Sequence, residues 1–505
     1  MKNTIFILFL FLSSKIIAQV PSQSELEQMT SDNWQSGVKL LNEIVAMPND
    51  AVYPEQIEVN ILWCERQFGE RAWSSERLDT GGIPLLLAQK NQPGATQTVL
   101  FYFHIDGQAV DRSKWHQKDP YVPELKVQND KGAWEIIPMA KLLDEYDPDW
   151  RIFARSTSDD KGPFAMFLTG WDALSKNGIS PNYNVKVILD FEEEQGSPRL
   201  PGAVKQYKDK LSADLMLIMD GPRHTSNLPT LSYGARGISE MTLTTYGPKV
   251  PQHSGHYGNY APNPGFLLAQ LLASMKDENG RVTIPGFYDG INLSSEEKAI
   301  LEAVPDDEAA IKKRLGLGRT DQVGQSYQES IQYPSLNIRG MQSAWVGPEA
   351  RTIVPATAMA ELDMRLVPES DPERLFALIQ DHIKKQGFHI ISDEPTDEER
   401  MMYPKLLRMN YTISYQAFRT PMNSEAGAWL RKAMVRAFGE EPIQIRISGG
   451  SIPISPFVDA LGIPAVTIPT VNADNNQHSP NENIRLGNYR EGITTILSVL
   501  TQPLQ

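Results

Sequence analysis

The chain has 505 residues, of which 41% are hydrophobic, 9% aromatic and one is a cysteine. This composition supports about two to four domains with sizeable cores, and a lone cysteine excludes an intrachain disulfide. The formal net charge of −14 disfavours binding to nucleic acid and to anionic membranes, because both carry dense negative charge.

The first predicted feature is an export signal over residues 1–18. Lys2 provides a short basic start, Ile5 to Leu12 form an apolar run, and Ala18 suits a cleavage site. The apolar run is too short to span a bilayer, so a retained anchor helix is the weaker interpretation. We therefore expect an exported protein, periplasmic or secreted, without a stable membrane span.

Residues 24–234 predict the first part of an α/β catalytic domain. Apolar, β-rich runs at 98–106, 183–194 and 213–221 predict strands, and the spacing of apolar residues at 164–176 predicts a helix. Strands that alternate with helices indicate a mostly parallel sheet with helices on both faces.

The pattern changes after about Gly234, and residues 235–418 predict an inserted α+β lid or dimerisation domain. Its expected strands and helices lie at 239–247, 263–277, 358–368 and 372–387. From 419 to 505 the α/β pattern returns, which predicts the second part of the catalytic domain.

Polar residues follow the apolar runs of the first part of the chain. His104, the acids Glu193 and Glu194, and Asp220 each stand at the end of a predicted strand. In parallel sheets, functional groups collect at the carboxyl ends of the strands. Asp106 faces the same side as His104 and could orient it on a metal ion, although the two could also form a surface pair.

Repulsion among three consecutive acids in FEEEQGS (191–197) would be relieved by a cation, and carboxylates with imidazole suit zinc, manganese or cobalt. A solvated charge run is the competing interpretation. Taken singly, Asp159 in SDDKG could cap a helix, and Asp220 and His478 could be ordinary loop residues. Of the eight histidines, the candidates for a functional role are His104, His253, His256 and His478.

Together these motifs resemble the metallopeptidase family of carnosinase, cytosolic nonspecific dipeptidase, carboxypeptidase G and succinyl-diaminopimelate desuccinylase. The resemblance begins near residue 35, extends to the C-terminus and is nearest the long-chain dipeptidase branch. The segments that carry it are HIDGQAVDRSKWHQKDPYVP, SDDKGP, HSGHYGNYAPNP, GRVTIPGFYDGI, RTIVPATAMAELDMRLVP, GGSIPI and HSPNEN.

The resemblance implies hydrolysis of a peptide bond in dipeptides or short peptides by a metal-bridged water. It implies two divalent metal ions per subunit, for which zinc is the first expectation and manganese or cobalt the alternatives. Asp159 would bridge the two ions, and Glu193 would be the general base. Asp106 would orient His104, and His253 would reach the other subunit of a homodimer. The implied metal ligands are His104, Asp159, Glu194, Asp220 and His478. The implied substrate contacts are Thr352, Arg365, Gly449 and Gly450.

The chain departs from the family pattern at positions that leave the implied metal ligands intact but affect the expected substrate. Phe103 replaces a glycine, Ser448 replaces an acid, and Tyr415 and Arg419 stand where a lid-domain histidine is expected. An N-acyl amino acid deacylase or a carboxypeptidase on the same metal core therefore stays open. A non-catalytic binding protein is a weaker alternative, because such a protein would have lost metal ligands or the base, and all are present here. A zinc-dependent carbohydrate or lipid hydrolase on another fold is also weaker, because nothing but the metal site would support it.

Overall fold

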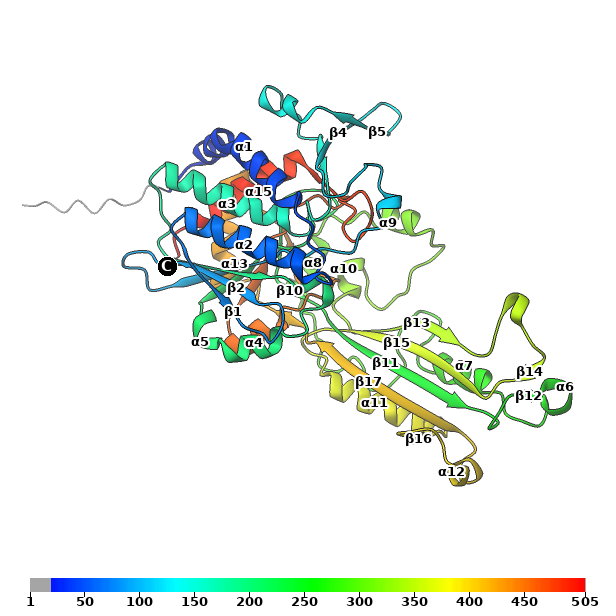
Figure 1. The fold of residues 1–505 in the computed structure, drawn as a ribbon. Coiled ribbons are helices and arrows are strands. Elements are labelled where there is room, and N and C mark those ends of the chain that lie inside the picture. Colours follow the sequence, from blue (N-terminus) through cyan, green and yellow to red (C-terminus); the bar gives the residue numbers. More distant parts are fainter. Residues whose placement is uncertain (1–19, 505) are drawn as a thin grey trace, which may run out of the picture.

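The computed structural model describes residues 20–504, so the predicted export signal lies outside the described residues. Figure 1 shows a larger domain that contains both ends of the described part of the chain and a smaller domain that extends away from it. Within residues 20–504, no helix combines the length and the apolar character needed to cross a bilayer.

The larger domain is built on an eight-stranded sheet with the order β1-β2-β7-β3-β8-β20-β9-β19. Its strands are β1 (Ser74–Leu78), β2 (Leu85–Lys90), β3 (Thr98–His104), β7 (Asn184–Asp190), β8 (Leu215–Ile218), β9 (Thr230–Ser232), β19 (Ile443–Ile445) and β20 (Ala465–Thr467). At its centre β3 runs parallel to both β7 and β8, and β8 runs parallel to β20. The predicted mostly parallel sheet is confirmed.

Helices cover both faces of this sheet, as predicted. One face carries α1 (Gln23–Val45), α2 (Pro54–Glu70), α3 (Lys161–Lys176), α13 (Glu425–Phe438) and α15 (Leu486–Thr501); the other carries α4 (Leu200–Gln206), α5 (Lys208–Leu211) and α14 (Ser455–Leu461). Successive side chains of β3 alternate between the two cores: Phe101 and Phe103 join one, Leu100 and Tyr102 the other. A strand that is buried on both faces has a continuous run of apolar residues. This is why the sequence at 98–106 could be recognised as a strand.

A second sheet of four strands brings two distant loops together. Its strands, in the order β21-β6-β4-β5, are β21 (Asn483–Arg485), β6 (Arg151–Phe153), β4 (Glu124–Gln128) and β5 (Trp134–Ile137). The short 3₁₀ helices η1 (Arg112–Lys114) and η2 (Met139–Leu143) flank β4 and β5 in the sequence. Antiparallel pairing of Asn483 with Phe153 sets the loop that follows β6 beside the loop that precedes β21. The first contains Asp159 and the second contains His478.

The smaller domain is an α+β unit inserted between the two parts of the larger one, as expected. Its sheet has the order β13-β15-β11-β17-β16, and α7 (Pro264–Ala273) and α11 (Pro372–Lys385) share its core. The strands are β11 (Gly237–Tyr246), β13 (Ser335–Gln342), β15 (Thr357–Leu366), β16 (His389–Ile391) and β17 (Leu406–Tyr415). Buried residues alternate with more exposed ones along β15, because one face packs on the helices.

Short elements complete the inserted stretch. At the junction of the domains, β10 (Gly234–Ala235) pairs with β18 (Phe418–Arg419). The others are β12 (Gln252–His253), β14 (Ile353–Val354), α6 (Ser254–Tyr257), α8 (Ser295–Glu302), α9 (Glu308–Leu315), α10 (Tyr327–Ser330), α12 (Asp397–Met402) and η4 (Gly347–Glu349). The segment from α8 to Gln332 contacts the larger domain: Arg446 donates to Glu297 and Gln332, and His224 Nε2 lies 3.0 Å from Asp306.

Candidate metal centre

The strands of the large sheet position the first side chains of the site. His104 is the last residue of β3, Asp220 follows β8, and the 3₁₀ turn η3 (Glu193–Gln195) follows β7. Because β3 is parallel to both neighbours, these three carboxyl ends meet at one edge of the sheet. This arrangement matches the prediction from the sequence that functional side chains lie together at these strand ends.

The other four predicted ligands lie together around Asp159. His104 Nε2 lies 2.9 Å from Asp159 Oδ1, and His478 Nε2 lies 3.0 Å from Asp159 Oδ2 and 3.2 Å from Glu194 Oε2. Their donor atoms form two groups, each within 4.8 Å: His104, Asp159 and Asp220 in one, and Asp159, Glu194 and His478 in the other. Asp159 is common to both groups, so it is the residue that could bridge two ions.

The chemistry of this donor set fits two divalent cations. Burial, with the neighbouring Asp159 charge, raises the pKa of Glu194 to about 7 and that of Asp220 to about 6. Close, buried carboxylates resist ionisation unless a cation compensates them. Imidazole nitrogens mixed with carboxylate oxygens match the preferences of zinc, manganese and cobalt.

Asp106 joins His104 to the turn that carries Glu193. Its carboxylate is fully buried, lies 3.4 Å from His104 Nδ1, and accepts hydrogen bonds from the backbone N–H groups of Glu193 (3.1 Å) and Glu194 (3.0 Å). Burial, reinforced by Asp220, Glu194 and Asp159 and opposed by His104, raises the pKa of Glu193 well above its ordinary value. A carboxyl group held in this way is suited to accept and return a proton.

Glu482 is a residue that the sequence did not single out, although it lies in HSPNEN. Its buried carboxylate accepts hydrogen bonds from the backbone N–H groups of Ser156 (2.8 Å), Ser158 (2.9 Å) and Asp159 (3.0 Å), and from Arg155 Nη1 (2.8 Å). The carboxylate therefore fixes the loop that presents Asp159. The signal that could have revealed it is an acid four positions after His478.

Asp190 is a second residue that was missed. It ends β7 and accepts hydrogen bonds from Glu192 N (3.0 Å), Ser197 Oγ (2.6 Å) and Tyr102 Oη (3.2 Å). It therefore anchors the chain on both sides of η3. An acid at the end of an apolar strand was its sequence signal.

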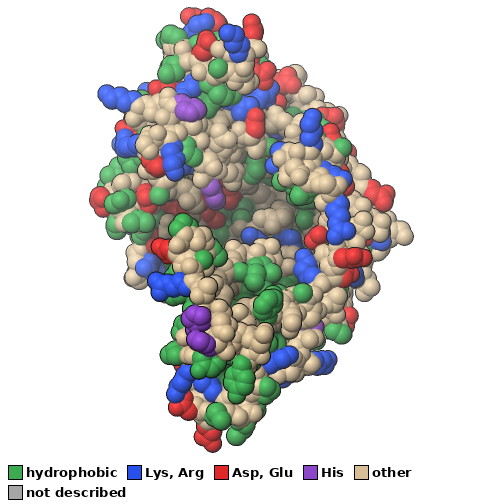
Figure 2. Space-filling model, turned by 90° about the vertical axis from the view of Figure 1, so that its right-hand side faces the viewer, with side chains coloured by type: hydrophobic (Ala, Val, Ile, Leu, Met, Phe, Trp, Pro, Cys, Tyr) green, Lys and Arg blue, Asp and Glu red, His purple; other side chains and the backbone are tan. Residues whose placement is uncertain are grey.

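The predicted substrate residues fall into two separate places. Arg365 Nη1, on β15, donates a 2.8 Å hydrogen bond to Ser451 Oγ, directly after Gly449 and Gly450. Figure 2 shows a hollow in the middle of one face of the molecule, with acidic side chains gathered at its edge.

His253 and Thr352 lie elsewhere. Both are exposed: His253 ends β12, Thr352 directly precedes the neighbouring β14, and Ser254 N donates to Thr352 O at 3.0 Å. Figure 1 shows these segments at the far end of the inserted domain. Within one chain the structure does not bring His253 and Thr352 to the other candidate residues.

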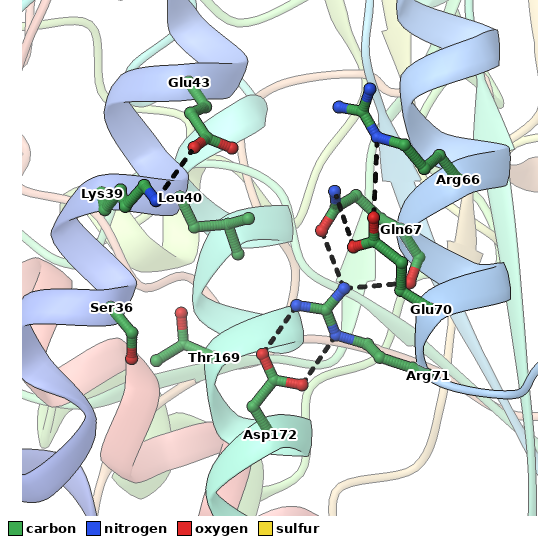
Figure 3. Close-up of a pocket in the computed structure, with 10 residues that line it drawn as sticks. All are labelled: Ser36, Lys39, Leu40, Glu43, Arg66, Gln67, Glu70, Arg71, Thr169 and Asp172. Atoms are coloured by element: carbon green, nitrogen blue, oxygen red, sulfur yellow. Dashed lines mark hydrogen bonds and ion pairs between the residues drawn. The ribbon is translucent and has the colours of Figure 1, made fainter.

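A groove of about 480 Å³ between α1, α2 and α3 is unrelated to this centre. Figure 3 shows that its charged side chains face one another. Arg71 makes 2.8 and 2.6 Å hydrogen bonds to Asp172, Lys39 pairs with Glu43, and Arg66 pairs with Glu70. These charges satisfy each other, so the groove offers no obvious ligand-binding group.

Comparisons with known proteins agree with this geometry. The chain is 26% identical over 416 residues to the Cys-Gly metallodipeptidase dug1 of Schizosaccharomyces pombe, covering 81% of this chain and 80% of that protein. It is 27% identical over 418 residues to the human Beta-Ala-His dipeptidase, covering 81% and 75% respectively. The structure of an M20 family metallo-carboxypeptidase, Sso-CP2 from Sulfolobus solfataricus, matches with a TM-score of 0.73 and 26% identity, covering 92% of this chain and 98% of that one. The family model described as peptidase family M20/M25/M40 matches residues 100–502. The chain therefore belongs to this family of metal-dependent peptide hydrolases, as its sequence motifs indicated.

Proposed function

We propose that this enzyme is a dipeptidase that uses two zinc ions, with manganese or cobalt as possible substitutes. The observation that carries the proposal is the placement of Asp159 in both groups of donor atoms, beside the turn that presents Glu193. The relatives named as Cys-Gly and Beta-Ala-His dipeptidases support small peptides as substrates.

In this mechanism, two divalent ions would polarise the scissile carbonyl and lower the pKa of the attacking water. Glu193 accepts the proton of that water and returns it to the leaving amine. Asp106 keeps His104 and Glu193 at a fixed separation, because it contacts both. The Arg365 guanidinium and the backbone at Gly449 and Gly450 are suited to hold a substrate carboxylate.

We further propose a homodimer in which His253 of one subunit completes the centre of the other and stabilises the oxyanion. Two observations support it: His253 lies far from the metal centre of its own chain, and the inserted domain exposes large apolar side chains. Those near β13, α7 and α6 include Tyr260 (86% exposed), Phe266 (70%), Met341 (55%), Trp345 (46%) and Val346 (85%). Apolar groups in such numbers are typical of a surface that a partner covers.

Export to the periplasm or the medium remains a proposal that rests on residues 1–18. N-terminal sequencing of the protein from fractionated cells should find it outside the cytoplasm and beginning after Ala18. An intact Met1 on cytoplasmic protein would contradict it.

The proposed base is tested by Glu193→Gln, which keeps the shape of the side chain but removes its proton acceptor. We expect turnover of dipeptides to fall by about 10²- to 10⁴-fold, with metal content unchanged by elemental analysis. Glu192→Gln is the matched control, since Glu192 lies in the same acidic run and pairs with Arg199 at 2.5 Å. Normal turnover by the Glu193 variant would refute the assignment.

A carboxypeptidase is the second candidate, and the similarity to Sso-CP2 favours it over an N-acyl amino acid deacylase. A panel of dipeptides, N-acetylated amino acids and longer peptides, with zinc, manganese or cobalt added, separates the candidates. Cleavage of dipeptides alone supports the proposal. Release of single C-terminal residues from longer peptides indicates a carboxypeptidase, and cleavage of N-acetylated amino acids indicates a deacylase.

A further inference from the structure

Tyr415, at the end of β17 in the inserted domain, contacts the turn that carries Glu193. Its hydroxyl donates a 2.9 Å hydrogen bond to the carbonyl oxygen of Gly196, the residue that ends η3. Gly196 has a φ of 80°, and a Cβ there would lie 2.5 Å from Tyr415 Oη. Burial and the negative charges of Glu193 and Asp190 raise the pKa of Tyr415, which agrees with a phenol placed beside the base.

The backbone aims Tyr415 at this turn. β17 follows a regular antiparallel register with β11 as far as Ile413 opposite Ser239, and then shifts so that Tyr415 lies opposite Ile238. The extra residue, Ser414, forms a bulge, and bulges redirect the side chains that follow them.

The same region is the connection between the two domains. A Cβ at Gly237 would lie 2.5 Å from Tyr415 O and 2.6 Å from Ala417 N, so the two crossing strands are in close contact. Just beyond them, β10 pairs with β18. A rotation of the inserted domain that displaces the end of β17 would change the distance between Tyr415 and Gly196.

The remaining anchors of the turn belong to the larger domain. Asp106 accepts from Glu193 N and Glu194 N, Asp190 accepts from Glu192 N and Ser197 Oγ, and Gln108 donates to Glu194. Among the hydrogen bonds that the described residues 20–504 make to this turn, only the one from Tyr415 comes from the inserted domain.

We propose that Tyr415 is a positioning residue that couples the orientation of the inserted domain to the position of Glu193. The inference rests on the proposed function, because it takes Glu193 as the base. A base works only when it is held in place relative to the reacting atoms, and small displacements lower the rate strongly. The Tyr415 hydroxyl should therefore affect turnover, whereas substrate binding through Arg365, Gly449 and Gly450 should not depend on it.

The test compares Tyr415→Phe with Tyr411→Phe, using a dipeptide that the wild-type enzyme cleaves. Tyr411 lies on the same strand, and its hydroxyl makes a 2.8 Å hydrogen bond to Glu373 within the inserted domain, so its variant loses a similar bond away from the turn. We expect Tyr415→Phe to lower kcat by about tenfold, with KM changed by less than about twofold. Metal content and Tm should match those of Tyr411→Phe, which should keep the wild-type kcat.

The coupling is refuted if Tyr415→Phe keeps kcat within about twofold of wild type, if only its KM changes, or if Tyr411→Phe loses kcat equally. Glu193→Gln, measured in parallel, separates the two proposals. An active Glu193 variant would overturn the proposed function. An inactive Glu193 variant beside an unaffected Tyr415 variant would overturn the coupling alone.

Discussion

Glu482 is buried among donors that approach its carboxylate from the Asp159 loop. Glu482→Gln would turn an amide N–H₂ group toward some of these N–H groups and leave them unsatisfied. We expect the free energy of unfolding to fall by about 3 kcal/mol and metal affinity to fall by about 10- to 100-fold. Urea denaturation and metal titration measure the two effects.

The matched control for this substitution is Glu135→Gln, because Glu135 is exposed. Among the described residues, its carboxylate accepts one hydrogen bond, from the Asn129 side chain at 2.7 Å. It should change neither quantity. Equal losses in both variants, or unchanged metal affinity in Glu482→Gln, would show that Glu482 does not organise the loop.

There is a physical reason why the sequence pointed to the five ligand candidates but not to Glu482. His104, Glu194 and Asp220 follow apolar strands, which makes them visible as polar residues at one sheet edge. The partners of Glu482 are more than 300 residues away in the chain, and only the pairing of β6 with β21 brings them together. Such a contact leaves no local pattern.

At the scale of elements, the start of α3 packs tightly against the Asp159 loop. A Cβ on Gly162 would lie 2.0 Å from the backbone oxygen of Thr157, which cannot move without shifting that loop. We expect Gly162→Ala to lower the free energy of unfolding by about 2 kcal/mol and to reduce bound metal, as measured by thermal unfolding and elemental analysis. Gly202→Ala is the control, since Gly202 lies in α4 with nothing within 4 Å of its Cβ position, and it should be neutral or slightly stabilising. Equal behaviour of both variants would contradict the prediction.

Helices and strands in which apolar residues recur at a regular spacing were predictable from the sequence, and short polar elements were not. The helix expected at 372–387 is α11 (Pro372–Lys385), and Gly387, with a φ of 85°, follows it as the expected stop. No helix was expected where α8, α9 and α10 lie, because each of these helices is short and its stability comes from contacts elsewhere. The contact of His224 with Asp306 is one of them, and it gives a place to a histidine that had no assigned role.

At the scale of the whole molecule, the insertion of one domain into another was visible in the sequence as a change of pattern and its reversal. The placement of His253 was implied by the family resemblance and not by a local pattern, because it depends on how far the inserted domain extends. Figure 1 places β12 at the end of that domain remote from the large sheet. In the proposed dimer, a histidine at this position would reach the metal centre of the partner subunit.

This explanation predicts that two inactive variants can complement each other. His253→Ala and Glu193→Gln homodimers should each be nearly inactive. In a mixed dimer, the centre of the His253→Ala subunit keeps Glu193 and receives an intact histidine from its partner, so one of the two centres is complete. Random exchange of subunits should therefore restore about a quarter of the wild-type activity per subunit. The measurement is dipeptide hydrolysis after unfolding and refolding the two variants together, compared with variants refolded separately and then mixed. Light scattering should report dimers in every sample. Recovery in neither mixture, or a monomer that is fully active, would show that His253 does not act between subunits.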